Sequence, residues 1–287
     1  MFYDRLLWYR YNKFSPAFAY RWITSATRSL PHFLIIGAQK CGTTSLYSYL
    51  VQHPKVISAN KKEVKYFDMF HQQSLGWYRS HFPTQSQLQS AGAITGEATP
   101  DYLFFEESAQ RVHDVVPNAK LIVLLRDPAD RSYSQYRYSS RRGYETLSFA
   151  DALAAEPQRL DDARNDAKKR GESITSHREF REYSYTLRSD YASQLDAWFK
   201  LFDRSQFLFL STTDLQTQAQ KVLDQTTDFL ELERHTFTFS ERLNSAPSTP
   251  SEEATRQIQQ LRQSFQPEMQ RLHAMTGLHF EPEVVAS

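Results

Sequence analysis

The chain has a single cysteine, Cys41, so no disulfide can form within it, and a reducing compartment suits this composition. No stretch reaches the roughly 18 consecutive apolar residues of a membrane-spanning helix, and the amino terminus lacks the apolar core of a secretory signal. The formal net charge is only +1, without the basic excess typical of nucleic-acid-binding proteins. These absences predict a cytoplasmic protein that binds no nucleic acid and has no transmembrane segment.

Residues 1–30 mix aromatic side chains with arginine and lysine, as in FYDRLLWYRYNKF. Two interpretations are open for this segment: a helix that packs on the domain, which we favour, and a helix in peripheral contact with a membrane or a partner. The 287 residues suffice for one large domain with a well-buried core, and no linker divides them. We therefore expect one domain over residues 31–287, preceded by this helical segment.

The most informative stretch is residues 33–50, FLIIGAQKCGTTSLYSYL, where a short apolar run breaks at Gly37 and a helical pattern begins after Gly42. It predicts a strand, a turn and a helix, with Lys40 inside the turn. Two glycines allow successive backbone N–H groups to converge on an anion at the start of the helix. The glycine spacing is that of a Walker A loop, but Thr43 stands where that loop has its lysine.

A second apolar run, in residues 119–136, AKLIVLLRDPADRSYSQY, leads directly into Arg126 and then a helix opened by Pro128. In a parallel sheet, ligands bind outside the carboxyl ends of the strands, which places Arg126 on the same rim as Lys40. A guanidinium suits a phosphate dianion better than an ammonium does. The alternative is an ordinary ion pair of Arg126 with Asp127 or Asp130.

The order G-x-x-K-x-G-T-T resembles the 5′-phosphosulfate loop of the sulfotransferases that use 3′-phosphoadenosine 5′-phosphosulfate (PAPS), and Arg126 with Ser134 resembles their 3′-phosphate site. The resemblance implies that PAPS is the donor and 3′-phosphoadenosine 5′-phosphate (PAP) the product. It implies no metal, because Lys40 stabilises the leaving phosphate. The residues implied to surround the 5′-phosphate are Gly37, Ala38, Gln39, Lys40, Cys41, Gly42, Thr43, Thr44 and Ser45.

Residues 60–70, NKKEVKYFDMF, resemble the Lys-Glu-x-His-Phe-Phe-Asp stretch of the heparan-type and related carbohydrate sulfotransferases. Glu63 falls on the catalytic glutamate, a carboxylate that would accept the proton of the acceptor as the new O–S bond forms. Asp68 matches the aspartate that supports the site, whereas Lys65 replaces the usual histidine and is expected to contact the substrate. The alternative is a solvated loop in which Glu63 pairs with Lys61, Lys62 or Lys65.

Residues 96–104, GEATPDYLF, resemble the Glu-Lys-[Ser/Thr]-Pro-x-Tyr segment of the same family. Glu97, Thr99 and Tyr102 are expected to line the acceptor cleft. Ala98 replaces the lysine, which suggests a less acidic acceptor than a heparan chain. Equally open is a plain turn that begins the following helix.

The expected architecture is a three-layer α/β fold of the P-loop-like type, with a mostly parallel central sheet flanked by helices. The strands are predicted near Phe33, Val56, Ile94, Leu121 and Phe207. Residues 149–181 begin with helical periodicity and continue with a charged stretch. This pattern predicts a helix followed either by a lid over the acceptor, as the resemblance implies, or by a solvated loop without a role. The nucleotide loop near the carboxyl terminus has no cation between Arg242 and Arg256, so another group must serve there.

The resemblance implies a sulfotransferase that moves a sulfuryl group from PAPS to a hydroxyl, or alternatively an amine, of a carbohydrate, lipid or secondary metabolite. Two rivals stay open. One is a P-loop nucleotide kinase or NTPase, favoured by the glycine spacing of residues 37–44. The other is a non-catalytic scaffold with the same fold, which would bind a partner through its aromatic amino terminus. The oligomeric state is not predicted.

Overall fold

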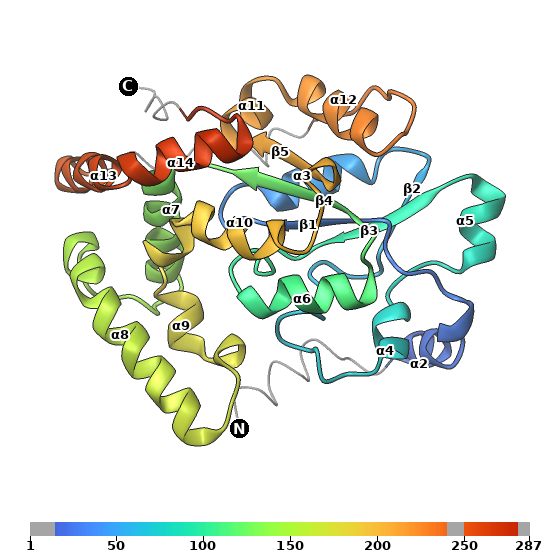
Figure 1. Cartoon of the computed structure of the whole chain (residues 1–287), viewed down its shortest axis with the longest axis horizontal. Coiled ribbons are helices and arrows are strands. Elements are labelled where there is room, and N and C mark those ends of the chain that lie inside the picture. The colour runs from blue at the N-terminus through green and yellow to red at the C-terminus, as the bar shows by residue number, and fades with distance from the viewer. Residues whose placement is uncertain (1–14, 240–249, 281–287) are drawn as a thin grey trace.

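A computed structural model describes residues 15–239 and 250–280 and has an α/β architecture, with helices on both sides of a central sheet (Figure 1). The described sheet has five strands in the order β2-β3-β1-β4-β5, and every neighbouring pair is parallel. This confirms the predicted fold class and all five predicted strand positions. The strands are β1 (Phe33–Gly37), β2 (Val56–Ser58), β3 (Ile94–Ala98), β4 (Lys120–Leu125) and β5 (Phe207–Ser211).

The two central strands are apolar because both of their faces are covered. All of β1 is buried, and only the first residue of β4 has partial exposure. Parallel neighbours need crossover connections, and here these are helical, so side chains on both faces meet helices. The pairs α6 with α10 and α3 with α12 pack together, on opposite sides of the sheet (Figure 1).

The helices that flank the sheet and the short helical turns between them account for most of the remaining described chain. The α-helices are α2 (Pro16–Ile23), α3 (Thr43–Leu50), α4 (Leu75–Arg79), α5 (Gln85–Ala91), α6 (Glu106–Val115), α7 (Pro128–Arg141), α8 (Phe149–Arg170), α9 (Arg178–Glu182), α10 (Tyr191–Phe199), α11 (Thr212–Thr217), α12 (Ala219–Phe229), α13 (Glu252–Ser264) and α14 (Gln266–Thr276). The 3₁₀ turns are η1 (Ser25–Thr27), η2 (Ile174–Ser176), η3 (Leu187–Ser189) and η4 (Arg204–Gln206).

The strand order brings the two predicted phosphate motifs together. Strand β1 lies between β3 and β4, so the turn after β1 and the turn after β4 open on the same edge of the sheet. The chain leaves β1 toward β2 on one side and leaves β4 toward β5 on the other. Such a switch point leaves a crevice outside the carboxyl ends of the strands, where open α/β sheets bind ligands.

The described part of the amino-terminal segment packs on the domain through arginines. The Arg21 guanidinium donates to the carbonyls of Ser80 (2.6 Å) and Phe82 (2.8 Å), and Arg28 donates to the same Phe82 carbonyl (2.9 Å). Tyr20 and Ile23 of α2 remain exposed. Residues 1–14 of this segment, and residues 240–249 of the predicted carboxyl-terminal nucleotide loop, lie outside the described residues.

The predicted helix after residue 149 is long. It starts where the Ser148 hydroxyl accepts a hydrogen bond from the Asp151 N–H (3.2 Å), and it ends at Gly171, whose φ is 63°. The part of the 149–181 stretch that follows this helix, predicted as a lid or a solvated loop, runs through η2 into α9. Among the helices of residues 15–239 and 250–280, none combines the length and apolar content that crossing a membrane requires.

Gly37 is required at the end of β1 because another segment approaches it closely. A Cβ on Gly37 would lie 2.6 Å from the Leu103 Cβ, well inside van der Waals contact. Leu103 cannot easily retreat, since its N–H donates to the Ile36 carbonyl (2.8 Å). The strand end and the 99–105 turn therefore fit together only without a side chain at position 37.

Replacing Gly37 by Ala is expected to lower the free energy of unfolding by about 1–3 kcal/mol, the usual cost of overpacking. Urea denaturation measures it. Gly143→Ala is the control, because its Cβ meets nothing within 4 Å and its cost is confined to a positive φ. A Gly37→Ala protein as stable as the wild type would contradict this close packing.

Candidate active site

The loop between β1 and α3 is a tight turn whose backbone faces the edge of the sheet. Gly42 has φ of 93° and Lys40 has φ of 71°, the left-handed region that residues other than glycine rarely adopt. The Ala38 N–H donates to the Leu124 carbonyl (2.8 Å), which fixes the start of the turn against β4. A non-glycine residue held in this conformation is a feature of functional sites, because the surrounding structure must compensate for the strain.

Thr212, at the start of α11, joins the two predicted phosphate motifs, a role that no pattern in the sequence indicates. Its hydroxyl lies 2.7 Å from the Cys41 carbonyl and 2.9 Å from the Leu125 carbonyl. Thr212 therefore holds the loop after β1 against the end of β4. Cys41 itself is fully buried, and burial raises the pKa of its thiol, so it acts as a packing residue.

Lys40 carries a positive charge that no described carboxylate neutralises. Its ammonium lies 4.3 Å from the centroid of the Tyr138 ring and forms no ion pair among the residues that the structure describes. Burial, together with the charges of Arg141, Arg131 and Arg126, lowers the pKa of Lys40 to about 8. A partly desolvated cation among arginines is suited to receive an anion.

Arg126 follows β4 directly and is half-buried, and because β4 lies parallel beside β1, it belongs to the same edge of the sheet as the loop that carries Lys40. The two aspartates of the alternative interpretation have a different arginine partner. Arg262 of α13 pairs with Asp127 (3.0 Å) and with Asp130 (2.9 Å). Asp127 also caps α7, accepting from the N–H groups of the next turn. Ser134 lies on α7, half-buried.

The side chain of Lys62 connects Glu63 to the loop after β1. The Lys62 ammonium donates to the Thr44 hydroxyl (3.0 Å) and lies 3.8 Å from the nearer Glu63 oxygen. The other Glu63 oxygen is 2.7 Å from the Lys65 ammonium. The ion pairs of the alternative interpretation therefore exist, yet the Glu63 side chain keeps 26% of its surface exposed. A carboxylate that is held and still accessible can accept a proton.

Behind Glu63 lies a buried network of charges centred on Asp101. The Lys65 ammonium is 2.8 Å from one Asp101 oxygen, Arg188 is 2.8 Å from the other, and Arg181 also pairs with Asp101. Although burial alone would raise the pKa of Asp101, the charges of Arg181, Lys65 and Arg188 hold it well below its usual range. The sequence analysis missed this role of Asp101 and of both arginines.

Asp68, the predicted supporting aspartate, lies at the edge of this network. It is fully buried, and one of its oxygens is 3.5 Å from Arg181. Burial raises the pKa of Asp68, while the charges of Lys65 and Arg181 oppose the rise. Asp68 is therefore placed to support the site from the core, without contact with Glu63 in any described hydrogen bond or ion pair.

Glu97, Thr99 and Tyr102 form a second buried cluster. The Glu97 carboxylate accepts hydrogen bonds from Tyr78 (2.8 Å), Thr99 (2.8 Å) and Tyr102 (3.0 Å). Burial raises the pKa of Glu97 to about 7. Three hydroxyl donors thus satisfy the buried Glu97 carboxylate. None of the three predicted residues has exposed surface, which corrects their predicted place in the acceptor cleft to one beneath it.

The sulfotransferase domain family matches residues 30–277. The chain belongs to the sulfotransferase family. The membrane-associated sulfotransferase kil1 of Dictyostelium discoideum is 30% identical over 266 residues, covering 71% of this chain and 56% of that protein. The human heparan sulfate glucosamine 3-O-sulfotransferase 6 is 31% identical, covering 72% of this chain and 54% of its own length.

Two further comparisons agree. The human bifunctional heparan sulfate N-deacetylase/N-sulfotransferase 3 is 31% identical over 75% of this chain, which spans 24% of that protein. The crystal structure of a sulfotransferase from Alicyclobacillus acidocaldarius superposes with a TM-score of 0.65 at 25% identity, covering 88% of this chain and 98% of the other. This sulfotransferase chain thus spans about half or less of the curated relatives named here.

These comparisons confirm the predicted membership of the sulfotransferase family and the predicted fold. They also correct one prediction. The cytoplasmic location expected from composition and hydropathy is wrong on this evidence, because a relative that matches most of the sulfotransferase chain is membrane-associated. The charge and apolar content on which that prediction rested do not by themselves determine where a protein is located.

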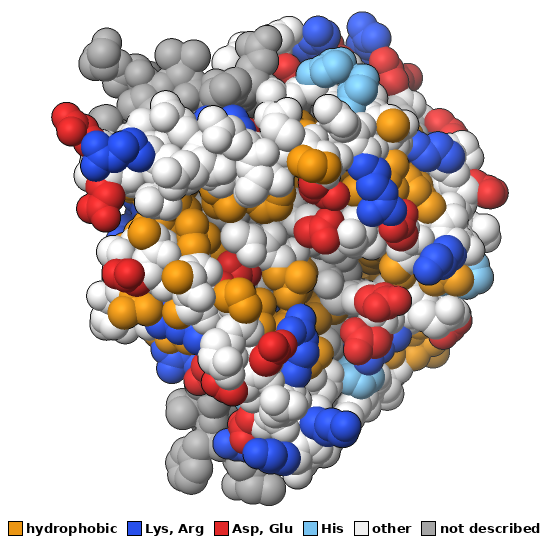
Figure 2. Space-filling view, turned by 60° about the vertical axis from the view of Figure 1, so that its left-hand side comes forward, with side chains coloured by type: hydrophobic (Ala, Val, Ile, Leu, Met, Phe, Trp, Pro, Cys, Tyr) orange, Lys and Arg blue, Asp and Glu red, His pale blue; other side chains and the backbone are white. Residues whose placement is uncertain are grey.

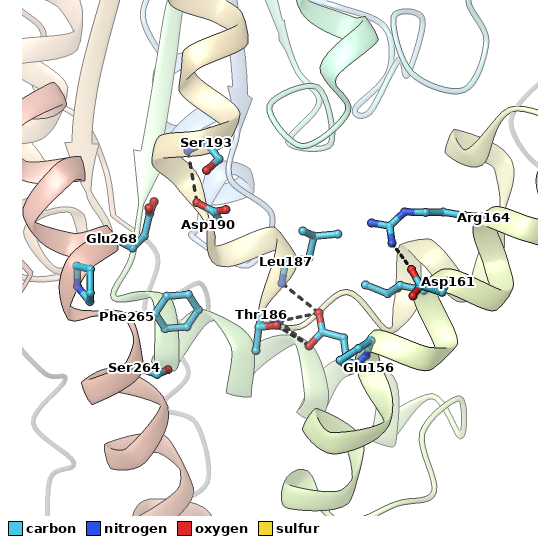
Figure 3. Close-up of a pocket in the computed structure, with 13 residues that line it drawn as sticks. Glu156, Asp161, Arg164, Thr186, Leu187, Asp190, Ser193, Ser264, Phe265 and Glu268 are labelled. Carbon is cyan, nitrogen blue, oxygen red and sulfur yellow. Dashed lines mark hydrogen bonds and ion pairs between the residues drawn. The ribbon is translucent and has the colours of Figure 1, made fainter.

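A separate cavity of about 590 Å³ opens between α8, α10 and the junction of α13 and α14 (Figure 3). The side of the molecule in Figure 2 shows hydrophobic side chains exposed between charged ones. Apolar and acidic side chains line the cavity, among them Leu160, Leu187, Phe265, Glu156, Asp190 and Glu268. No residue of the nucleotide loop or of the 60–70 segment belongs to it, so the sulfotransferase chemistry is assigned to the strand ends despite the size of this cavity.

PAP affinity is expected to fall by about tenfold from about pH 7 to about pH 9. Lys40, with its pKa lowered to about 8, is charged below that pH and loses its charge above it. Calorimetric titration measures the change. Lys40→Met should bind PAP weakly, with little pH dependence over this range. Lys40→Arg should keep, at about pH 9, the affinity that the wild type has at about pH 7. An affinity that stays constant in the wild type would contradict the role of this ammonium.

Proposed function

We propose that this protein transfers a sulfuryl group from PAPS to a hydroxyl group, or alternatively an amine, of a carbohydrate acceptor. The matched heparan sulfate 3-O-sulfotransferase and N-sulfotransferase support this choice among the broader acceptor classes, because their names specify transfer to a carbohydrate oxygen and nitrogen. The chain spans only part of those proteins, so the acceptor is taken from them as a class and not as a compound.

One observation carries the proposal. The loop after β1 holds Lys40, a cation that pairs with no described carboxylate, and Lys62 connects this loop to the accessible carboxylate of Glu63. Lys62 contacts the loop at Thr44 (3.0 Å) and approaches Glu63 at 3.8 Å. Lys40 of the same loop forms no ion pair among the described residues. These contacts support an anion-binding centre at Lys40 and a proton acceptor at Glu63 in neighbouring segments, the two parts that group transfer requires.

On the donor side, PAPS supplies the sulfuryl group when it is bound. The loop N–H groups and the Thr43 and Thr44 hydroxyls would hold the 5′-phosphate at the start of α3. The Lys40 ammonium would neutralise the charge that builds on the phosphate oxygen as its bond to sulfur breaks. Arg126 and Ser134 would hold the 3′-phosphate, Arg126 through a guanidinium that can donate two hydrogen bonds.

On the acceptor side, Glu63 would accept the proton of the attacking hydroxyl. The acceptor oxygen forms its bond to sulfur while the bond from sulfur to the phosphate oxygen breaks, so PAP leaves and the proton resides on Glu63. In-line transfer of this kind is catalysed mainly by positioning and by charge stabilisation. Lys62 and Lys65 on the two Glu63 oxygens would hold the carboxylate toward the loop.

The test compares nucleotides and then looks for product. PAP should raise the melting temperature more than ATP with magnesium does. Incubation with PAPS and a heparan-derived oligosaccharide should yield an acceptor heavier by one sulfuryl group in mass spectrometry. Greater stabilisation by ATP with magnesium would favour the nucleotide kinase, and PAP binding without any sulfated product among carbohydrate acceptors would favour the non-catalytic scaffold.

Lys40→Ala is expected to lower kcat at least about a thousandfold, because it removes the charge that stabilises the leaving phosphate. Arg126→Gln should instead act on binding and raise the Kd for PAP by about tenfold to a hundredfold. Initial rates and calorimetry separate the two effects. Lys200→Ala is the control, since Lys200 is exposed at the end of α10. Full turnover by Lys40→Ala would refute the mechanism.

A further inference from the structure

We propose that Lys65 is a positioning residue that orients the Glu63 carboxylate and anchors it to Asp101. The inference rests on the proposed function and concerns how the base is held. The sequence placed Lys65 among the substrate contacts, where related enzymes have a histidine. Its side chain is instead only 6% exposed, so little of it can reach an acceptor.

Two carboxylates share the Lys65 ammonium. Its Nζ is 2.7 Å from a Glu63 oxygen and 2.8 Å from an Asp101 oxygen. An ammonium has three donors and no fixed plane, so it can bridge two acceptors that lie in different directions. The Lys65 N–H also contacts the Thr99 hydroxyl (3.3 Å), which fixes the backbone from which the side chain extends.

Asp101 makes a rigid anchor because cations from three segments converge on it. Besides Lys65, it pairs with Arg181 of α9 and with Arg188 of η3 (2.8 Å), and it has no exposed surface. The Arg188 guanidinium also lies 4.0 Å from the centroid of the Phe104 ring. The orientation of Glu63 therefore depends on residues of the predicted lid, through Lys65 and Asp101.

The geometry separates what Lys65 does for each carboxylate. Without the Lys65 charge, Asp101 keeps both arginines, so the buried anchor stays compensated. Glu63 would keep only Lys62, at 3.8 Å. Removing the charge thus leaves Glu63 with one distant lysine. It also removes one of the two cations that compensate the buried Asp68, so the variant is expected to lose stability as well as rate.

Lys65→Met removes the charge at similar side-chain length. It should lower kcat by about tenfold to a hundredfold while the KM for PAPS and the Kd for PAP stay within about twofold. Lys65→Arg should recover part of the rate. Lys120→Met is the matched control, because it breaks a lysine–glutamate pair of 2.6 Å, Lys120 with Glu231, at the far end of β4. Wild-type kcat in Lys65→Met would overturn the inference.

The decisive measurement repeats the substitution in a Glu63→Gln background. If Lys65 acts through Glu63, Lys65→Met should add little to the loss of rate in that background. An equal loss in both backgrounds would overturn the inference and leave Lys65 a structural residue.

A second measurement needs no activity and so separates the inference from the proposed function. Chemical denaturation is applied to Lys65→Met, to Glu63→Gln and to the double variant. The double variant should lose less stability than the sum of the two single losses, since either substitution breaks the same pair. Strict additivity would overturn the inference. If the two substitutions are coupled in stability but the wild-type protein sulfates no acceptor, the Lys65–Glu63 interaction is supported and the proposed function is refuted.

Discussion

The balance of charge at the carboxyl edge of the sheet is the constraint on which this site depends. Buried carboxylates there are compensated inside the protein: three cations meet Asp101, and three hydroxyls meet Glu97. Lys40 is different, because no described carboxylate pairs with it and neighbouring arginines disfavour its charge. Placing a cation in this way costs stability, and an anionic ligand offsets that cost.

The fold supplies the place for this imbalance. Because β1 lies beside β4, turns that are far apart in the sequence open side by side. Thr212, which follows β5, donates to carbonyls of the loop after β1 and of the last residue of β4, and so holds the two parts of the rim together. Rigidity matters here because transfer is catalysed by holding groups in place, and small displacements of those groups are expensive.

The acceptor side is organised differently, through side chains. Glu63 is held by lysines from its own segment, and one of these lysines leads to Asp101 and to arginines on α9 and η3. The proposed donor rim is thus built from backbone and strand ends, whereas the proposed base, Glu63, depends on a chain of ion pairs that reaches α9 and η3. This division fits enzymes that keep one donor and vary their acceptors, because loops can change while the sheet stays.

The sequence by itself determined the five strands, the α/β class and the two phosphate motifs, because apolar runs and glycine spacing are local properties of the chain. Only the tertiary structure decided that Asp101, which resembles a turn residue, is a buried hub, and that Glu97, Thr99 and Tyr102 lie beneath the cleft. Asp101 meets its arginines across 80 and 87 residues, a separation that leaves no periodic trace in the sequence. Burial, likewise, is settled by what packs against a residue and not by its neighbours along the chain.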